Sequence, residues 1–272
     1  MRNVRLAFRT LFRTPFVTAV AVLSLALGIG ANSAIFSVTD QVLLRPLPVQ
    51  EPGRLINLTA PGPNPGSQSC NQAGNCNEIF SYPMFKDLAR SQTVLTGLAG
   101  HRIFGANFAF HGEPITGDAA EVSGSYFHTL GLSPALGRLI EPEDDAVIDN
   151  GFVAVLSYAF WHGRLGADPH IVGQTIEVNG QLVTIVGVGP RDFEGTTFGS
   201  HPSVFVPLSV GAKLLAYGAY TNRRYYYLYL FGRLKPGVTM AQAKSALDAI
   251  YRPILNDVEA PLQTGMSAAT MA

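Results

Sequence analysis

The chain has 272 residues, of which 47% are hydrophobic and 14% are charged, and its formal net charge is zero. This length is sufficient for one large domain or two small ones, each with a hydrophobic core. The charged fraction lies well below the roughly 25% of typical soluble domains, which indicates that part of the chain lies outside water. Because no basic excess is present to neutralise phosphates, the composition argues against nucleic acid as a partner.

The first 15 residues form a basic segment without an acidic side chain. Four arginines recur there at spacings of three and four, so they share one face of a helix: Arg2, Arg5, Arg9 and Arg13. The pattern predicts a short amphipathic helix at residues 1–15 that lies on the cytoplasmic membrane surface, with lipid as its partner. The alternative is that the arginines act only as a cluster of charges that sets the membrane topology.

An uncharged stretch from residue 14 to residue 39 follows. About 20 apolar residues cross a bilayer, so we predict a transmembrane helix at residues 16–38. A cleaved signal peptide is the alternative, because residues 26–28 and 31–33 have the small residues of cleavage sites. The apolar run continues beyond both, which favours a retained anchor. The arginine excess before the helix predicts a single-pass protein of the cell inner membrane, with a cytoplasmic N-terminus and an extracytoplasmic main domain.

Small and polar residues interrupt this predicted membrane helix. Ala26, Gly30 and Ala34 recur every four positions, which would let a second helix approach closely. The complete predicted helix-packing face is Ala26, Gly30, Asn32, Ser33, Ala34 and Ser37. We expect its partner to be a second copy of this chain or another membrane helix. The alternative is that these are the small residues ordinarily found in membrane helices.

The two cysteines of the chain, Cys70 and Cys76, lie in a polar segment at residues 61–77 that reads as an exposed loop. Outside the cytosol they would form a disulfide, and closing so small a loop contributes about 2 kcal/mol. Two free thiols are the alternative. A metal site is not indicated, because no second pair of ligands lies nearby.

From about residue 40 onward, strand and helix patterns mix without strict alternation, which predicts an α+β fold. Strands are expected at 54–60, 98–111, 115–123, 152–156, 175–178, 182–188, 204–208 and 225–234, and helices at 82–92, 125–130 and 158–165. The dipeptide Asn179-Gly180 predicts a hairpin turn. A capping box from Thr239 to Gln242 predicts a last helix, with an apolar stripe of Ala243, Leu247, Ile250 and Ile254. We therefore expect an extracytoplasmic domain at residues 39–257 and a flexible tail at 258–272.

The strand at residues 225–234 is densely aromatic. Strict alternation would place Tyr225, Tyr227, Tyr229 and Phe231 on one face of the strand. The pattern fits a central strand covered on both sides, and an aromatic ligand groove is the alternative.

Motifs of known catalytic chemistry are missing from the sequence. It has no His-Glu-x-x-His, no Cys-x-x-Cys, no Gly-x-Ser-x-Gly and no Walker-type loop. The acidic run of Glu141, Glu143, Asp144 and Asp145 lacks the spacing of a calcium loop and predicts a solvated turn. We therefore expect no enzymatic activity, no catalytic residue, no cofactor and no metal. An anchored hydrolase would require a nucleophile and a histidine that only folding brings together.

Several segments together resemble one family. The arginine-rich start, followed by ALGIGANSAIFSVTDQVLLRPLP and EPGRL, resembles the first membrane helix of MacB-like ABC permeases, with most likeness to the duplicated-orphan-permease (ADOP) subgroup. The segments FSYPMFKDL, VSGSYFHTLGLSPALGR, VAVLSYAFWHGRLGADPHIVGQTIEVNGQLVTIVGVGPRDFEG and GRLKPGVTMAQA are similar, in order, to the periplasmic core domain of that family. The likeness covers about residues 1–255.

This resemblance implies a subunit without catalysis of its own, in a dimer driven by a separate cytoplasmic ABC ATPase. The extracytoplasmic domain would transmit the movement of the membrane helices to substrates or partner proteins. Family members typically continue through more extracytoplasmic sequence and three further membrane helices, so we expect a truncated product, a fragment or one part of a split permease. The alternative is a membrane-tethered extracytoplasmic binding module that acts alone.

Overall fold

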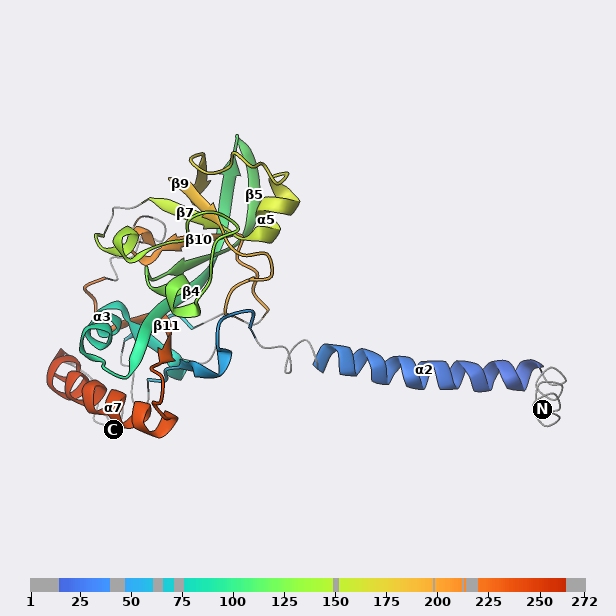
Figure 1. The fold of residues 1–272 in the computed structure, drawn as a ribbon, viewed down its shortest axis with the longest axis horizontal. Helices are drawn as coiled ribbons and strands as arrows, with labels where there is room; N and C mark the ends of the chain where they lie inside the picture. Colours follow the sequence, from blue (N-terminus) through green and yellow to red (C-terminus); the bar gives the residue numbers. More distant parts are fainter. Residues whose placement is uncertain are drawn as a thin grey trace. The chain divides into compact units, whose positions relative to one another are not determined.

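The computed structural model describes residues 15–39, 47–60, 66–70, 76–148, 152–197, 199–211, 213 and 220–262, and the chain forms two units, residues 1–46 and 47–272. The described part of the first unit is one helix, α2, Pro15–Thr39 (Figure 1). Pro15 stands at its start, where a missing N–H costs little. Its stretch Pro15–Phe36 is long and apolar enough to cross a membrane, and none of it is buried.

The second unit is built on one sheet of eleven described strands, eight of which follow the path β1-β11-β4-β5-β10-β7-β9-β6. Strands β2 and β3 also pair with β11, and β8 pairs with β4 and β9. The pairs β5–β10, β7–β9 and β2–β11 are parallel, whereas the other described pairs are antiparallel. The strands are β1 Leu55–Asn57, β2 Ser67–Gln68, β3 Ile79–Ser81, β4 Leu95–Phe110, β5 Glu113–Val122, β6 Leu136–Gly137, β7 Val153–Leu156, β8 Thr175–Val178, β9 Gln181–Val188, β10 Val204–Pro207 and β11 Tyr225–Leu234.

Among the described residues, three short helices lie between these strands, and a fourth, α7, follows β11. They are α3 Tyr82–Ser91, α4 Tyr126–Leu130, α5 Tyr158–Arg164 and α7 Met240–Pro253. A π-helical turn, Ile254–Glu259, and a 3₁₀ turn, Ala260–Leu262, follow α7. Further 3₁₀ turns are Pro52–Arg54, Cys76–Glu78, Pro142–Asp145 and Leu208–Val210. The mixed α/β fold predicted from the sequence is confirmed.

Local sequence signals account for several of these boundaries. The Ser81 hydroxyl accepts from the N–H of Met84 at 3.3 Å and begins α3, and Ser157 begins α5 in the same way. At Asn179 and Gly180, φ is 48° and 83°, as a two-residue turn between β8 and β9 requires. The predicted capping box also forms, since Thr239 N–H donates to Gln242 Oε1 at 2.9 Å.

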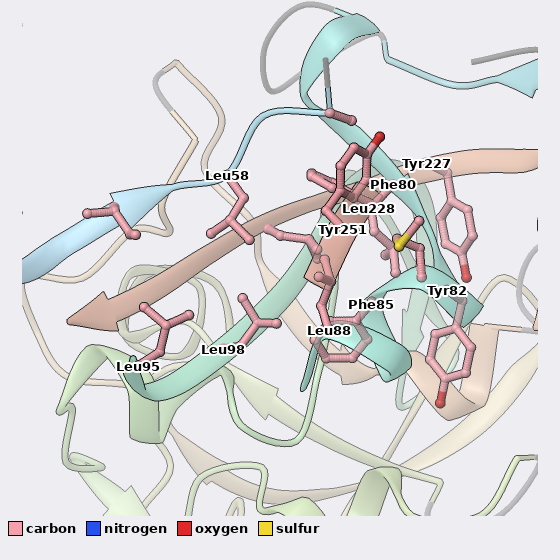
Figure 2. Close-up of a cluster of buried hydrophobic side chains, with 14 of the residues drawn as sticks. Leu58, Phe80, Tyr82, Phe85, Leu88, Leu95, Leu98, Tyr227, Leu228 and Tyr251 are labelled. Carbon is pink, nitrogen blue, oxygen red and sulfur yellow. The ribbon is translucent and has the colours of Figure 1, made fainter. Parts of the chain in front are cut away.

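Helices α3 and α7 cover one part of the sheet, around β11 and the first half of β4 (Figure 2). The apolar face of α3, with Met84, Phe85 and Leu88, is buried there. From α7, Ala243 and Tyr251 are buried, and the rest of the predicted stripe is partly buried against the same cluster. Burial of each large apolar side chain contributes about 1.5–3 kcal/mol, so this cluster fixes α3 and α7 to the sheet.

Strand β4 extends through all three large clusters of the core. Its early residues Leu95 and Leu98 belong to the cluster below α3 and α7. Ile103 joins a second cluster around α4, and Phe104 and Phe108 join a third cluster below α5. With 16 residues, β4 is the longest described strand of the sheet, and it pairs with β5 along most of that length (Figure 1). The core is therefore continuous along one strand.

Two acidic positions lie deeper than the sequence indicated. The predicted solvated turn contains Asp145, which is buried and accepts from the N–H groups of Gly124 at 3.2 Å and Ser209 at 2.7 Å. In the predicted tail, residues 258–262 are helical and Glu259 is only 1% exposed. Both predictions were wrong at these residues, because each carboxyl group finds partners distant in the sequence. Residues 263–272 lie outside the described residues.

Candidate functional site

The side chains predicted to form a helix-packing face lie on α2. Ala26, Gly30, Asn32, Ser33 and Ala34 are all exposed, and no atom lies within 4 Å of a Cβ built at Gly30. Ala26, Gly30 and Ala34 share one side, whereas Asn32 is turned about 200° from Gly30, because each residue advances a helix by about 100°. Asn32 therefore belongs to a different face. The Ser37 side chain and the four N-terminal arginines lie outside the described residues.

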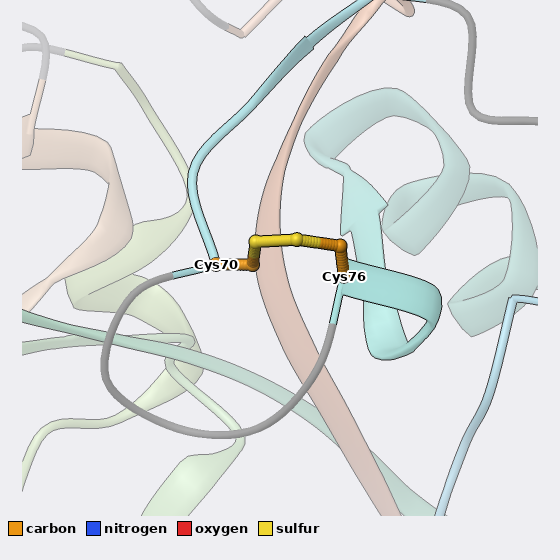
Figure 3. Close-up of a disulfide and its surroundings, with 2 residues drawn as sticks. All are labelled: Cys70 and Cys76. Atoms are coloured by element: carbon orange, nitrogen blue, oxygen red, sulfur yellow. A yellow bond between two sulfur atoms is a disulfide. The ribbon is translucent and has the colours of Figure 1, made fainter.

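A disulfide joins Cys70 and Cys76 in the structure, with the Cα atoms 5.2 Å apart (Figure 3). Both cysteines are partly buried against a small cluster of Ile79, Tyr226 and Tyr229. The N–H of Ser69 also donates to the carbonyl of Tyr226 at 2.9 Å. The disulfide therefore packs on β11, where it closes a loop beside β2 and β3.

The four aromatic residues of β11 do not share one face. Tyr225 and Tyr227 stack with ring centroids 4.9 Å apart and contact the cluster below α3 and α7. Tyr229 packs beside the disulfide, and Phe231 joins the cluster around α4. The pairing of β11 with β3 shifts register between residues 226 and 228, and such a bulge reverses the alternation of side chains. The predicted single aromatic face was therefore wrong.

A buried histidine, His101, contacts the rings of Tyr229 and Phe231. The ring of His101, on β4, lies 5.9 Å from that of Tyr229, 5.8 Å from that of Phe231 and 6.0 Å from that of Tyr126. Burial lowers the pKa of His101 to about 4, because an apolar environment disfavours the imidazolium. Its Nδ1 has no hydrogen-bond partner among the described residues. His101 is therefore a neutral core side chain at physiological pH.

A cavity of about 120 Å³ lies next to this histidine. Its lining includes Asn57, His101, Thr196, Tyr229 and Phe231. A larger, mostly apolar groove of about 370 Å³ lies between β1 and α7. Ile56, Leu58, Leu247 and Tyr251 are among the residues that line the groove. The lining of the smaller cavity also includes Glu78. A third hollow of about 200 Å³ is lined by Ser157, Glu194, His201 and Ser203 among others.

The histidines are spread over separate elements. His101 lies in β4, His111 follows β4 and contacts Gln174 at 3.1 Å, and His162 lies in α5. His201 Nδ1 lies 2.7 Å from a carboxylate oxygen of Glu194. In the described part of the chain, no group of three or more His, Cys, Asp or Glu residues is arranged to hold a metal ion.

Residues 47–54, named here the leading segment, are the first described residues of the second unit. Two arginines hold them to the sheet. Arg233 of β11 donates to the carbonyls of Thr129 at 2.7 Å and Leu130 at 3.2 Å, and its Nη1 donates to Glu51 O at 3.3 Å. Arg54 donates to the carbonyl of Leu234 at 3.0 Å.

The attachment by Arg233 is buried, since this residue is only 8% exposed. Its partners Thr129 and Leu130 lie in the last turn of α4, where unpaired carbonyls and the helix dipole favour a cation. Arg233 was not among the site residues predicted from the sequence. The signal was present, however, because a lone arginine between Phe231 and Leu234 in an apolar strand requires buried acceptors.

The family assignment rests on a comparison with known families. A family model described as the MacB-like periplasmic core domain matches residues 18–250. The chain belongs to this family. The resemblance seen in the sequence segments is thereby confirmed, and the chain combines a MacB-like periplasmic core domain of the ABC permease type with one candidate membrane helix.

Two solved structures have a similar fold. The periplasmic region of MacB from Actinobacillus actinomycetemcomitans has a TM-score of 0.53 and 14% identity, and covers 72% of this chain and 92% of its own. The extracellular domain of the noncanonic ABC-type transporter YknZ from Gram-positive bacteria has a TM-score of 0.53 and 14% identity. The matched region covers 76% of this chain and 95% of the YknZ chain. A search of curated proteins gave no match. At these identities the structures establish the fold of the MacB-like domain.

Proposed function

We propose that this MacB-like chain is a permease subunit, without catalysis of its own, of an ABC-type transport or mechanotransmission system. Helix α2 would lie in the cell inner membrane with a cytoplasmic N-terminus, and the second unit would lie on the extracytoplasmic side. The observation that carries the proposal is the combination of an exposed apolar helix with the family match over residues 18–250.

The proposal requires partners for α2. A separate cytoplasmic ABC ATPase would supply the energy, and a second permease copy or another membrane helix would pack on the side of Ala26, Gly30 and Ala34. The recurrence of these small residues every four positions supports such a contact, because a neighbouring backbone can then approach closely. Lipid would cover the remaining faces of the helix.

The leading segment would carry movement into the domain. Arg233 and Arg54 bond it to β11 and α4 through backbone carbonyls, and hydrogen bonds that involve a charged group are about twice as strong as neutral ones. A segment held by such bonds moves together with the sheet to which it is bonded. The alternative of a stand-alone binding module has less support, because the aromatic residues of β11 are divided between two faces.

The topology is tested with a C-terminal tag on the full chain in spheroplasts. We expect external protease to remove the tag, because the second unit would lie outside. A tag that stays protected, while a known periplasmic protein is digested, would contradict the topology.

The helix contact is tested by single cysteines in α2, in a background with Cys70→Ser and Cys76→Ser. We expect Ala26→Cys to crosslink between copies or to a partner helix in membranes. The matched control is Leu25→Cys, which lies about 100° away on the helix and should crosslink less. Equal crosslinking at both positions would show that no specific face exists.

A further inference from the structure

The end of α7 has an unusual backbone, which sets the position of Glu259. Pro253 has no N–H and cannot complete the α-helical hydrogen-bond pattern. Residues 254–259, named here the terminal turn, adopt π-helical geometry, and the N–H of Ala260 donates to Leu255 O, five residues earlier. Such π turns are frequent at functional positions. This geometry places the Glu259 carboxyl group in the interior, at 1% exposure.

One guanidinium serves two carboxyl groups at this position. Arg223 Nη2 donates to Asp87 Oδ2, in α3, at 2.7 Å. Its Nη1 lies 3.6 Å from Glu259 Oε1, which is too long for a hydrogen bond. Glu259 Oε1 has no hydrogen-bond partner among the described residues. Arg223 and Asp87 are partly exposed, whereas Glu259 is buried. If both acids were ionised, the three side chains would carry one net negative charge, and burying the Glu259 carboxylate would be costly.

The groups that interact with Glu259 come from four described parts of the chain. Arg223 approaches from the segment before β11, Asp87 from α3, Ser81 from the end of β3 and Tyr251 from α7. Burial raises the pKa of Glu259 to about 7, and the negative charge of Asp87 adds to this increase. The positive charge of Arg223 and a hydrogen bond from the Ser81 hydroxyl act in the opposite direction and lower the pKa. Glu259 thus binds a proton more tightly here than it would in water.

We propose that Glu259 and Arg223 form a proton-dependent latch that holds the terminal turn against α3 and the start of β11. With Glu259 protonated, Arg223 and Asp87 are a balanced pair and the latch is closed. When Glu259 ionises, the three side chains gain a net negative charge, and the cost of burying the carboxylate is removed when the turn moves Glu259 into water. The latch goes beyond the proposed permease function and does not depend on it.

The direction of the pH effect follows from proton linkage. A released Glu259 has the ordinary pKa of about 4.5, so closing the latch takes up a proton between that pH and about 7. The equilibrium constant for opening the latch therefore rises between pH 4.5 and about 7, and it does not change further at higher pH. The full difference corresponds to more than tenfold in the opening constant, because each pH unit in the window contributes up to about tenfold.

The experiment measures amide hydrogen exchange of residues 254–262 in the full chain in lipid nanodiscs, from pH 5 to pH 8. Observed rates are divided by the intrinsic rates at each pH. We expect the wild-type protection factor to fall more than tenfold over this range, whereas Glu259→Gln stays protected throughout. In Asp87→Asn, Arg223 no longer pairs with a second carboxylate and can compensate the charge of Glu259. The protection factor of this variant should therefore fall less with pH than that of the wild type.

Amides of the β4–β5 hairpin are the internal control, and their protection should be the same in all three proteins. A variant that loses protection in this hairpin has a damaged fold and is set aside. If Glu259→Gln is damaged in this way, Glu259→Asp is used in its place. This variant keeps a shorter acid, so its protection factor should still fall with rising pH. The latch is refuted if Glu259→Gln shows the wild-type fall, or if the wild-type protection factor does not change with pH.

Discussion

The leading segment and the terminal turn are both attached to the sheet through arginines, but the acceptors differ. Arg233 and Arg54 donate to backbone carbonyls, which keep the same charge at every pH. Arg223 pairs with the side chains of Asp87 and Glu259, whose charges depend on pH. The comparison shows that one kind of side chain can build a permanent attachment or a conditional one, and the acceptor decides which.

The largest expected effect comes from a substitution in α3, the helix on which the terminal turn packs. It should weaken the terminal turn more than the leading segment. Leu88 of α3 is 1% exposed, and Leu88→Ala should lower the free energy of unfolding by about 4 kcal/mol, because a large buried side chain leaves a cavity. Urea denaturation measures the loss. In hydrogen exchange the terminal turn should lose more protection than the leading segment. Equal losses in both would contradict the separation of the two attachments.

Removing the Arg233 attachment of the leading segment should lower the free energy of unfolding somewhat less than Leu88→Ala does. Arg233→Ala leaves the buried carbonyls of Thr129 and Leu130 without this donor, and we expect a loss of about 3 kcal/mol in the free energy of unfolding. The matched control is Arg54→Ala, at a partly exposed position, with an expected loss of about 1 kcal/mol. The same denaturation experiment measures both, and a larger loss for Arg54→Ala would reverse the order inferred from burial.

The two regions should also respond to pH in opposite directions. His101 lines the cavity that Leu47 of the leading segment also lines, and its folded pKa of about 4 lies below the unfolded value of about 6.5. The stability from neutral His101 is therefore present above pH 6.5 and is lost as the pH falls towards 4. From pH 7 to pH 5 the loss should be about 2 kcal/mol.

His101→Phe should remove this acid sensitivity, as measured by urea denaturation at a series of pH values. For Glu259 the folded pKa is raised, so its stability is present below the unfolded pKa of about 4.5 and is lost as the pH rises to about 7. An unchanged acid response in His101→Phe would show that other groups produce it.

The smallest expected effect is that of the disulfide. The double variant Cys70→Ser with Cys76→Ser should lose about 2 kcal/mol of unfolding free energy, since the closed loop is short. Hydrogen exchange should increase at β2 and β3, with little change at either attachment. A larger loss at the leading segment than at β2 would show that the disulfide supports more than its own loop.

The elements that the sequence predicted depend on neighbours within a few residues. Ser81, Ser157 and Thr239 begin helices by bonding N–H groups three residues later, and the Asn179-Gly180 turn needs only its own backbone. Such signals are complete in a short window of sequence, and they placed α3, α5, α7 and the β8–β9 hairpin correctly.

The features that the sequence missed depend on distant partners. Asp145 is buried because Ser209, 64 positions later, supplies an N–H group. Glu259 is ordered because Arg223 and Ser81 approach from other elements. The bulge in β11 forms where this strand pairs with β3, and a pattern read on one strand cannot contain it. Sequence therefore predicts elements better than it predicts the buried charges that join them.

Strand β4 has 16 residues, and at about 3.3 Å per residue it extends over roughly 50 Å. Because all three large clusters pack on it, a tilt of this strand would displace residues in each of them. A rotation of one degree about one end of a straight strand of this length would move the other end by roughly 1 Å. A small tilt below α3 would therefore become a displacement about as large as a hydrogen bond tolerates at the far tip of the β4–β5 hairpin.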